Sequence, residues 1–263
     1  MFATFGSFVG INLIRNPSNS TLTYMLDRVR IILVSPSHPG NIGSAARAMK
    51  TMGLTQLYLV DPKFFPHSDA TALAVGASDL LEGASVCDSL DEALMGTVFS
   101  VAATARHRDL SHKTMAPRQV AGAFLEKTAE GDVAIVFGPE RTGLTIEDAT
   151  KCNVISTIPC NPDYSSLNLA QAVQVFTYEL KVRSAEGAIS GGIGRLVERA
   201  THEEIEGLIG HFEKVLIEID FLNAKNPGRV MQRIRRLVAK TELEKEELNI
   251  LRGFLSAVEK KAL

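Results

Sequence analysis

The sequence predicts an α/β protein with a mostly parallel sheet, followed by a small C-terminal helical region. Short apolar runs rich in valine and isoleucine alternate with amphipathic segments in the first part of the chain, as is typical of a parallel sheet that helices cover on both faces. A glycine-rich stretch then leads into a last part in which apolar residues recur at helical spacing. With 263 residues, 45% of them hydrophobic, the chain is long enough for one large domain or two ordinary ones.

The strands and helices of the sheet domain follow from these patterns. Continuous apolar runs predict buried strands over residues 29–34, 56–61, 98–104, 132–138 and 153–159. Amphipathic segments predict helices over residues 42–52, 90–95, 117–128 and 166–183. Asn41 is the expected N-cap of the first of these helices, and Pro117 suits the first position of the third.

Changes in composition predict four parts of the chain. Residues 1–24 form an extension that is expected to be poorly ordered, unless translation starts at Met25. Residues 25–183 form the sheet domain, residues 184–195 a glycine-rich linker, and residues 196–263 a helical domain. In this helical domain, a capping box of Thr241 and Glu244 is expected to open the final helix.

Composition and charge exclude several classes of protein. The formal net charge is −2, so any nucleic-acid binding has to come from local basic patches. Three cysteines without a CxxC pair favour a reduced, cytoplasmic setting. The six histidines form no HxxxH or HExxH pair, so no metal site is expected. No apolar run approaches the length of a membrane span, and no membrane partner is expected.

The loops that follow the predicted strands are the candidate site, because ligands of open α/β sheets bind at the carboxyl ends of the strands. No GxGxxG follows a strand and no GxxxxGK[ST] occurs, which disfavours a conventional dinucleotide or P-loop site. Single residues in these loops remain ambiguous. Arg47 could be an ordinary surface arginine, Glu140 could brace its own loop, and Ser165, Ser166 or Asn168 could be helix caps.

Three segments together resemble a known family. They are GNIGSAARAMKTMG (40–53), VFGPERTGLT (136–145) and IPCNPDYSSLNLAQAVQVFTYE (158–179). In this order and spacing they resemble the SpoU/TrmH branch of the SPOUT RNA methyltransferases over residues 29–182. GASDLLEGA (76–84), NPGRVMQRIRRL (226–237) and ELNILRGFL (247–255) are similar to the TrmJ subfamily, so the resemblance extends through the helical tail.

The resemblance implies a fold and an activity. The fold is the SPOUT fold, with a C-terminal trefoil knot that binds S-adenosylmethionine, in a homodimer whose active sites lie at the dimer interface. The activity is 2′-O-methylation of cytidine or uridine at nucleotide 32, in the anticodon loop of tRNA. Two alternatives remain: a ribosomal-RNA 2′-O-methyltransferase of the SpoU family, and a non-catalytic RNA-binding protein with the same fold.

The resemblance also implies site residues. Arg47 matches an arginine proposed to act on the ribose hydroxyl. Because a guanidinium is always protonated, we expect it to bind the adjacent phosphate and stabilise the developing alkoxide, although the role of a base stays open. The catalytic candidates are Arg47, Asn41, Glu140, Ser166 and Asn168. The expected walls of the cofactor site are Ala103, Thr104, Ala105, Gly138, Ile158, Ser165, Ser166 and Leu167.

Two groups of basic residues predict an RNA-binding surface. The first group follows the third predicted strand, beside the expected cofactor site, and the second recurs at spacings of four, three and four on one helix face. A solvated charged face is the alternative. Binding to phosphates is preferred, because like charges along one helix face repel unless an anion offsets them. The residues are Arg106, Arg108, Lys113, Arg229, Arg233, Arg236 and Lys240.

Overall fold

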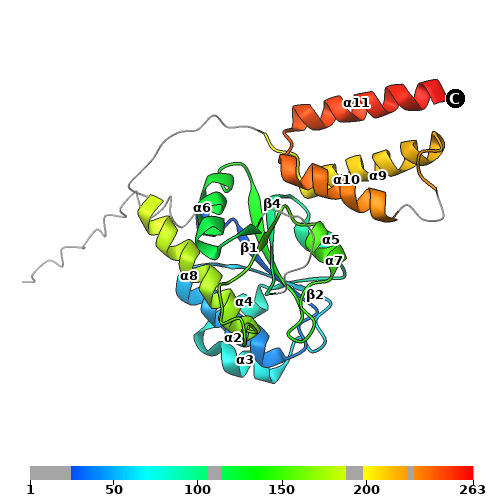
Figure 1. The fold of residues 1–263 in the computed structure, drawn as a ribbon. Helices are drawn as coiled ribbons and strands as arrows, with labels where there is room; N and C mark the ends of the chain where they lie inside the picture. Colours follow the sequence, from blue (N-terminus) through cyan, green and yellow to red (C-terminus); the bar gives the residue numbers. More distant parts are fainter. Residues whose placement is uncertain (1–24, 106–113, 188–197, 224–227, 263) are drawn as a thin grey trace, which may run out of the picture.

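A seven-stranded sheet, parallel at every pairing, forms the centre of the computed structural model (Figure 1). The structure describes residues 25–105, 114–187, 198–223 and 228–262. The predicted extension of residues 1–24 lies outside the described residues. The strand order is β3-β2-β1-β6-β4-β7-β5. The predicted α/β class with a parallel sheet is confirmed.

All five predicted strands are present, and two short strands were not predicted. The predicted strands are β1 (Val29–Val34), β2 (Gln56–Val60), β4 (Thr97–Ala103), β6 (Asp132–Phe137) and β7 (Val154–Ser156). The additional strands are β3 (Ser85–Cys87) and β5 (Thr114–Met115). Each of these two is at an edge of the sheet and is too short to show a continuous apolar run.

Alternating side chains of the strands pack on opposite faces of the sheet. Ile31 and Leu33 of β1 face a core formed with α2, α6 and α8, whereas Ile32 and Val34 face a smaller core under α5 and α7. The helices of this domain are α2 (Pro39–Met52), α3 (Ser68–Ala74), α4 (Ser78–Glu82), α5 (Leu90–Leu94), α6 (Pro117–Lys127), α7 (Ile146–Thr150) and α8 (Leu169–Gly187).

Two predicted helix ends are wrong. Asn41 is not the N-cap of α2, because the cap is His38 and Pro39 occupies the first turn, where its missing N–H costs nothing. The helix expected over residues 166–183 is α8, which continues to Gly187. The first residues of the predicted linker are therefore helical, and Ser184 is buried. The rest of that linker, residues 188–195, lies outside the described residues.

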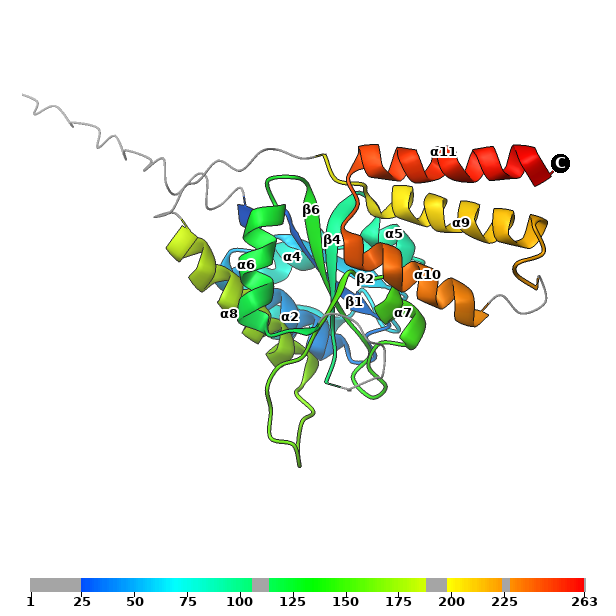
Figure 2. The same ribbon diagram turned by 45° about the horizontal axis from the view of Figure 1, so that its top comes forward.

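Over residues 198–223 and 228–262, the helical domain is a layer of three helices, α9 (His202–Glu218), α10 (Gly228–Thr241) and α11 (Lys245–Ala262). Figure 2 shows α9 between α10 and α11. Leu208 and Val215 of α9 form a core with Leu248 and Leu255 of α11. Among the described residues, no helix is long and apolar enough to cross a membrane.

The predicted capping box of Thr241 and Glu244 is wrong. Thr241 is the last residue of α10, and its hydroxyl donates to the carbonyl oxygen of Val238. Glu242 follows with a φ of 49°, which breaks the helix. The backbone N–H of Glu244 instead donates to the carboxylate of Glu247, so the reciprocal residue lies three positions further along the chain than expected.

Candidate functional site

A cavity of about 260 Å³ lies at the carboxyl ends of β4, β6 and β7. This is room for a small molecule rather than for a few waters. Its walls come from the end of β4, the loop after β6, the loop after β7 and the first turns of α8. The structure brings all eight predicted cofactor-site residues to this one cavity: Ala103, Thr104, Ala105, Gly138, Ile158, Ser165, Ser166 and Leu167.

The cavity combines an apolar side with small polar groups. Phe137, Leu169 and Phe176 contribute apolar surface, and the loop after β7 contributes the exposed Ser165 and Ser166. Such a surface suits a ligand with a flat apolar group and a polar remainder.

Gly138 has a structural reason to be glycine. A Cβ at this position would lie 2.2 Å from the backbone nitrogen of Leu144 and 2.4 Å from the carbonyl carbon of Gly143. The loop after β6 therefore folds back on its own start. This close approach shapes the wall of the cavity. The conformation of the loop therefore requires a glycine here, whether or not a ligand also does.

Glu140 joins the loop after β6 to the loop after β1. Its carboxylate accepts hydrogen bonds from the Ser37 backbone N–H (3.0 Å), the Ser37 hydroxyl (2.7 Å), the His38 backbone N–H (3.3 Å) and Asn41 Nδ2 (2.8 Å). Burial alone would raise the pKa of the Glu140 carboxyl, but the bonds from Ser37 and Asn41 outweigh burial and lower that pKa to about 2. Glu140 is thus an ionised acceptor that braces two loops.

Asn41 and Asn168 extend this hydrogen-bond chain to α8. Asn168 Nδ2 donates to Asn41 Oδ1 (2.9 Å), and Asn41 Nδ2 donates to Glu140. Asn168 Oδ1 also accepts from the backbone N–H groups of Ala170 and Gln171, as an N-cap does. Three of the predicted catalytic residues therefore form one chain that fixes three loops relative to one another.

Arg47 lies apart from this chain. It is exposed on α2 and is not among the residues that line the cavity. Among the described residues, its side chain has no hydrogen-bond or ion-pair partner within the chain. The side chain is therefore available to a ligand or to a second copy of the protein.

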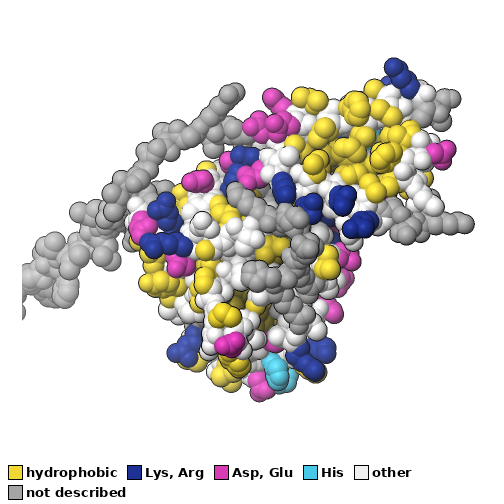
Figure 3. Space-filling model, viewed as in Figure 1, with side chains coloured by type: hydrophobic (Ala, Val, Ile, Leu, Met, Phe, Trp, Pro, Cys, Tyr) yellow, Lys and Arg dark blue, Asp and Glu magenta, His cyan; other side chains and the backbone are white. Residues whose placement is uncertain are grey.

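The predicted RNA-binding residues fall into two groups in the structure. Arg106, Arg108 and Lys113 lie outside the described residues. Arg229, Arg233, Arg236 and Lys240 all lie on α10, where Arg236 is half-buried and the other three are exposed. Figure 3 shows lysine and arginine side chains along this helix.

Sequence reasoning missed several residues of the site. Ser37 gives two hydrogen bonds to Glu140, and Arg141, Leu169 and Phe176 line the cavity. Leu169 and Phe176 belong to the apolar stripe of the predicted helix, which by itself indicates only a place in the core. Ser37 directly follows Pro36 in the loop after β1, and only the fold shows that this loop meets Glu140.

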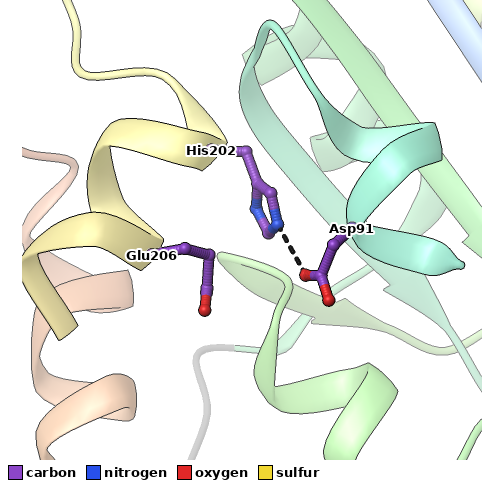
Figure 4. Close-up of side chains that lie close together, drawn as sticks. All are labelled: Asp91, His202 and Glu206. Atoms are coloured by element: carbon purple, nitrogen blue, oxygen red, sulfur yellow. Dashed lines mark hydrogen bonds and ion pairs between the residues drawn. The ribbon is translucent and has the colours of Figure 1, made fainter. Parts of the chain in front are cut away.

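A second cluster of ionisable groups lies between the two domains (Figure 4). Asp91 of α5 contacts His202 Nε2 of α9 at 3.0 Å, and Glu206 lies nearby on α9. These groups have the residue types of a metal site. However, Lys151 Nζ is 2.6 Å from Asp91, and Arg235 pairs with Glu206, so each carboxylate already has a cationic partner. The cluster is therefore an interdomain ion-pair network, and the absence of a metal stays a prediction.

Comparison with known proteins matches a family model to each of the two parts of the chain. Residues 28–178 match the SpoU rRNA Methylase family, and residues 203–263 match the C-terminal domain of the tRNA methyltransferase TrmJ.

Whole-chain relatives agree. The chain is 46% identical over 249 residues to the tRNA (cytidine/uridine/adenosine-2′-O-)-methyltransferase TrmJ of Pseudomonas aeruginosa, covering 90% of this chain and 96% of that protein. It is 45% identical over 243 residues to the tRNA (cytidine/uridine-2′-O-)-methyltransferase TrmJ of Escherichia coli K12, covering 89% and 96%. The crystal structure of TrmJ from Z. mobilis ZM4 superposes with a TM-score of 0.78 at 37% identity, covering 88% of this chain and 98% of that one. The chain therefore belongs to the SpoU methylase family and, within it, to the TrmJ methyltransferases.

Proposed function

We propose that this protein transfers the methyl group of S-adenosylmethionine to the ribose 2′-hydroxyl of cytidine or uridine at position 32 of tRNA. The observation that carries the proposal is that residues from four separate segments of the chain form the walls of one cavity. Its relatives named TrmJ are tRNA 2′-O-methyltransferases, which supports tRNA as the substrate. Position 32 comes from the resemblance alone.

The cavity residues fit the proposed cofactor. Backbone groups and small side chains of Ala103–Ala105 and Ser165–Leu167 would hold its polar parts, and Ile158 and Phe176 would contact its flat ring. When bound, S-adenosylmethionine supplies an electrophilic methyl group on a sulfonium. The braced loops around Glu140 hold these walls in place before any ligand binds, which reduces the ordering cost of binding.

The chain's own residues have to orient the hydroxyl and stabilise the charge that develops on its oxygen. The 2′-oxygen forms a bond to the methyl carbon, the carbon–sulfur bond breaks, and the hydroxyl proton leaves to solvent or to a nearby base. Arg47 would hold an adjacent phosphate with two parallel hydrogen bonds and stabilise the developing alkoxide. Ser166, which lines the cavity, is the candidate to position the hydroxyl.

Arg47 would act on the cavity of a second copy. Its side chain is exposed on α2 and is not part of its own cavity wall. The family resemblance implies a homodimer with the active site at the interface, and an exposed arginine without an internal partner among the described residues fits this arrangement. The exposed basic residues of α10 would bind the tRNA backbone.

The test is methyl transfer from labelled S-adenosylmethionine to unmodified total tRNA, with the product nucleotide mapped by mass spectrometry. We expect a 2′-O-methylated pyrimidine at position 32. Arg47→Ala should lower kcat by about 100-fold or more, the order seen when a group that stabilises a developing oxyanion is removed. Arg118→Ala is the matched control, because Arg118 is also an exposed arginine of the same domain and has only a 3.8 Å ion pair.

Other results would contradict the proposal in distinct ways. Methylation at another tRNA position would exclude position 32. Methylation of ribosomal RNA but not tRNA would favour the SpoU alternative. Cofactor binding without transfer to any RNA would favour a non-catalytic RNA-binding protein.

A further inference from the structure

Tyr164 presents an aromatic ring to solvent close to the cavity. It lies in the loop between β7 and α8, which projects from the sheet domain (Figure 2). Its side chain is 79% exposed, and no large hydrophobic residue that the structure describes is more exposed. Within the described residues, the ring stacks on no other ring and the hydroxyl makes no hydrogen bond. The ring is therefore available for contact with another molecule.

The backbone fixes the point from which this ring projects. The N–H of Tyr164 donates to the carbonyl oxygen of Asn161 (3.0 Å), and these two residues pair as an antiparallel bridge. The N–H of Asp163 donates to Asn161 Oδ1 (3.0 Å), which closes the same turn. At the other end of the segment, Asn168 caps α8 and bonds to Asn41. A segment held at both ends loses little freedom when it meets a ligand.

The ring adjoins the residues that would contact the ribose. Ser165, Ser166 and Leu167 follow Tyr164 directly, and all three line the cavity. Two residues of chain span at most about 7 Å, which limits the separation of Tyr164 and Ser166. In a nucleotide, the base is attached to the ribose carbon next to the one that carries the 2′-hydroxyl. A nucleotide whose hydroxyl meets Ser166 therefore has its base close to Tyr164.

We propose that the Tyr164 ring stacks on the base of the nucleotide that is methylated, and so holds its ribose beside Ser166. This inference rests on the proposed function and adds the residue that binds the target base. The bases of RNA loops are the ones that proteins take up on aromatic side chains, because those bases are free to unstack. Tyr164 is thus a substrate-binding residue outside the cofactor cavity.

Stacking also accounts for the acceptance of two bases at one site. Cytosine carries an amino donor where uracil carries a carbonyl acceptor, so a site that read this edge by a fixed hydrogen bond would reject one of them. The flat faces of the two bases are alike, and an aromatic ring holds both. The hydroxyls of Ser165 and Ser166 can each donate or accept, so they favour neither base.

The first test is steady-state kinetics of the full-length protein with unmodified tRNA. Tyr164→Ala should raise the KM for tRNA by about tenfold, the loss expected when one stack of a base on an aromatic ring is removed. The KM for S-adenosylmethionine should not change, whereas a purely structural role would raise it, because the next three residues line the cavity. Tyr164→Phe keeps the ring and should stay within about twofold of the wild type, and Tyr164→Leu should behave as Tyr164→Ala.

The second test uses the lack of tryptophan in this chain. Tyr164→Trp introduces a single tryptophan, whose fluorescence falls when a base stacks on it. With S-adenosylhomocysteine present to prevent turnover, unmodified tRNA should quench the emission. A tRNA with an abasic ribose at position 32 should quench it about fivefold less, and one with an abasic ribose at position 33 should quench it as the intact tRNA does.

Met95→Trp is the matched control for the fluorescence. Met95 is 56% exposed and directly precedes β4 at the amino-terminal end of the strands, opposite the cavity. Its emission should be the same with all three tRNAs. This comparison separates stacking on the target base from a general effect of bound RNA.

Several results would overturn the proposal. They are an unchanged KM for tRNA in Tyr164→Ala, a Tyr164→Phe variant as weak as Tyr164→Ala, and equal quenching by intact tRNA and tRNA abasic at position 32. Emission of Tyr164→Trp that changes with protein concentration before RNA is added would show that the ring packs on a second copy instead.

Failure of the proposed function gives a different result. A wild type that methylates another nucleotide contradicts position 32 alone, and the abasic ribose is then placed at that nucleotide, where the same loss of quenching is expected. A wild type that methylates no RNA would overturn both the proposed function and this inference.

Discussion

Glu140 shows how one side chain at the cavity can organise a site by joining two loops. A carboxylate has about four acceptor positions, and four donors from the loop after β1 and from α2 occupy them. Sequence reasoning leaves two interpretations of this residue, a brace and a site residue. The structure supports the brace, and a brace at this place also determines the shape of the cavity wall.

Glu140→Gln should destabilise the protein by roughly 2 kcal/mol at pH 7, because an amide N–H would then face other donors. The lowered pKa means that the carboxylate contributes stability above its ordinary pKa of 4.5, and that this is lost as pH falls from 4.5 toward about 2. Chemical denaturation from pH 7 to pH 3 measures this. The wild type should lose more stability over that range than Glu140→Gln, and Glu126→Gln, an exposed control, should behave as the wild type. Parallel curves for wild type and Glu140→Gln would contradict the brace.

Asn41 shows what the sequence can and cannot determine at a single residue. Asparagine before an apolar helical repeat is a good N-cap on local grounds. In the structure, the Asn41 side chain instead forms hydrogen bonds with Glu140 and Asn168, which are 99 and 127 residues away in the sequence. The sequence did contain a local signal for the observed, earlier start of α2, because Pro39 is favoured in the first turn of a helix. No local signal could have identified the two distant partners.

At the scale of elements, α2 is held by its contact with α3. A Cβ at Gly43 would lie 2.0 Å from the carbonyl oxygen of Ala70 and 3.0 Å from the backbone nitrogen of Ala74. The two helices therefore touch through backbone at this point. Because α2 carries both Asn41 and Arg47, this contact determines where those residues lie.

Gly43→Ala should destabilise the protein by about 1–3 kcal/mol, since α3 has to move to admit one methyl group. Gly76→Ala, where the new Cβ meets nothing within 4 Å, should change the stability by less than about 0.5 kcal/mol. Thermal unfolding of both variants measures the difference. Equal effects of the two substitutions would show that α2 and α3 do not meet through Gly43.

The basic face of α10 should contribute to tRNA binding and not to cofactor binding. Replacing Arg229, Arg233 and Lys240 by Gln should weaken binding and reduce the salt dependence, by about one unit of slope for each lost phosphate contact. Titrations of tRNA at several salt concentrations test this, with Arg118→Gln as the control for removal of a surface charge. An unchanged affinity would mean that these residues are only a solvated face.

Elements with long, uniform patterns could be predicted, and short ones could not. The strands β1, β4 and β6 could be predicted because helices cover both faces of the sheet, so that these strands are continuous apolar runs. β3 and β5 have three and two residues, and their pairing partners rather than their composition make them strands.

The predicted capping box of Thr241 and Glu244 was wrong for another reason. A Thr-x-x-Glu pattern fits the end of one helix as well as the start of the next, and only the backbone turn at Glu242 decides between them.

At the scale of the whole molecule, the ion-pair network between α5 and α9 joins the two domains. The hydrogen bond from His202 is the main cause that lowers the pKa of Asp91, and Lys151 lowers it further against the effect of burial. Asp91 therefore stabilises the domain contact above the ordinary pKa of an aspartate and loses this effect only as pH falls well below it.

Asp91→Asn should loosen the helical domain without unfolding the sheet. We expect backbone amides at the start of α9 to exchange hydrogen about tenfold faster, while amides of β1 keep their protection. Asp79→Asn, which removes a carboxylate bonded to Lys50 on the surface, is the control. Equal protection of α9 in the variant and the wild type would show that the network does not hold the domains together.

Sequence patterns predicted two domains, but not how they contact each other. Asp91 and His202 are 111 residues apart, and neither has a neighbouring motif that marks it. Both are ordinary polar residues until the fold places them 3.0 Å apart. The knot implied by the family resemblance likewise stays a prediction, because threading is a property of the whole path of the chain.

The order of the cavity walls along the chain has a consequence during synthesis. The walls begin at Ala103 and are complete only when Phe176 has been added. The bond between Asn41 and Asn168 cannot form earlier either. A growing chain on the ribosome therefore cannot form the complete cavity until β7 and the first turns of α8 have emerged, so no ligand can bind there before that point of translation.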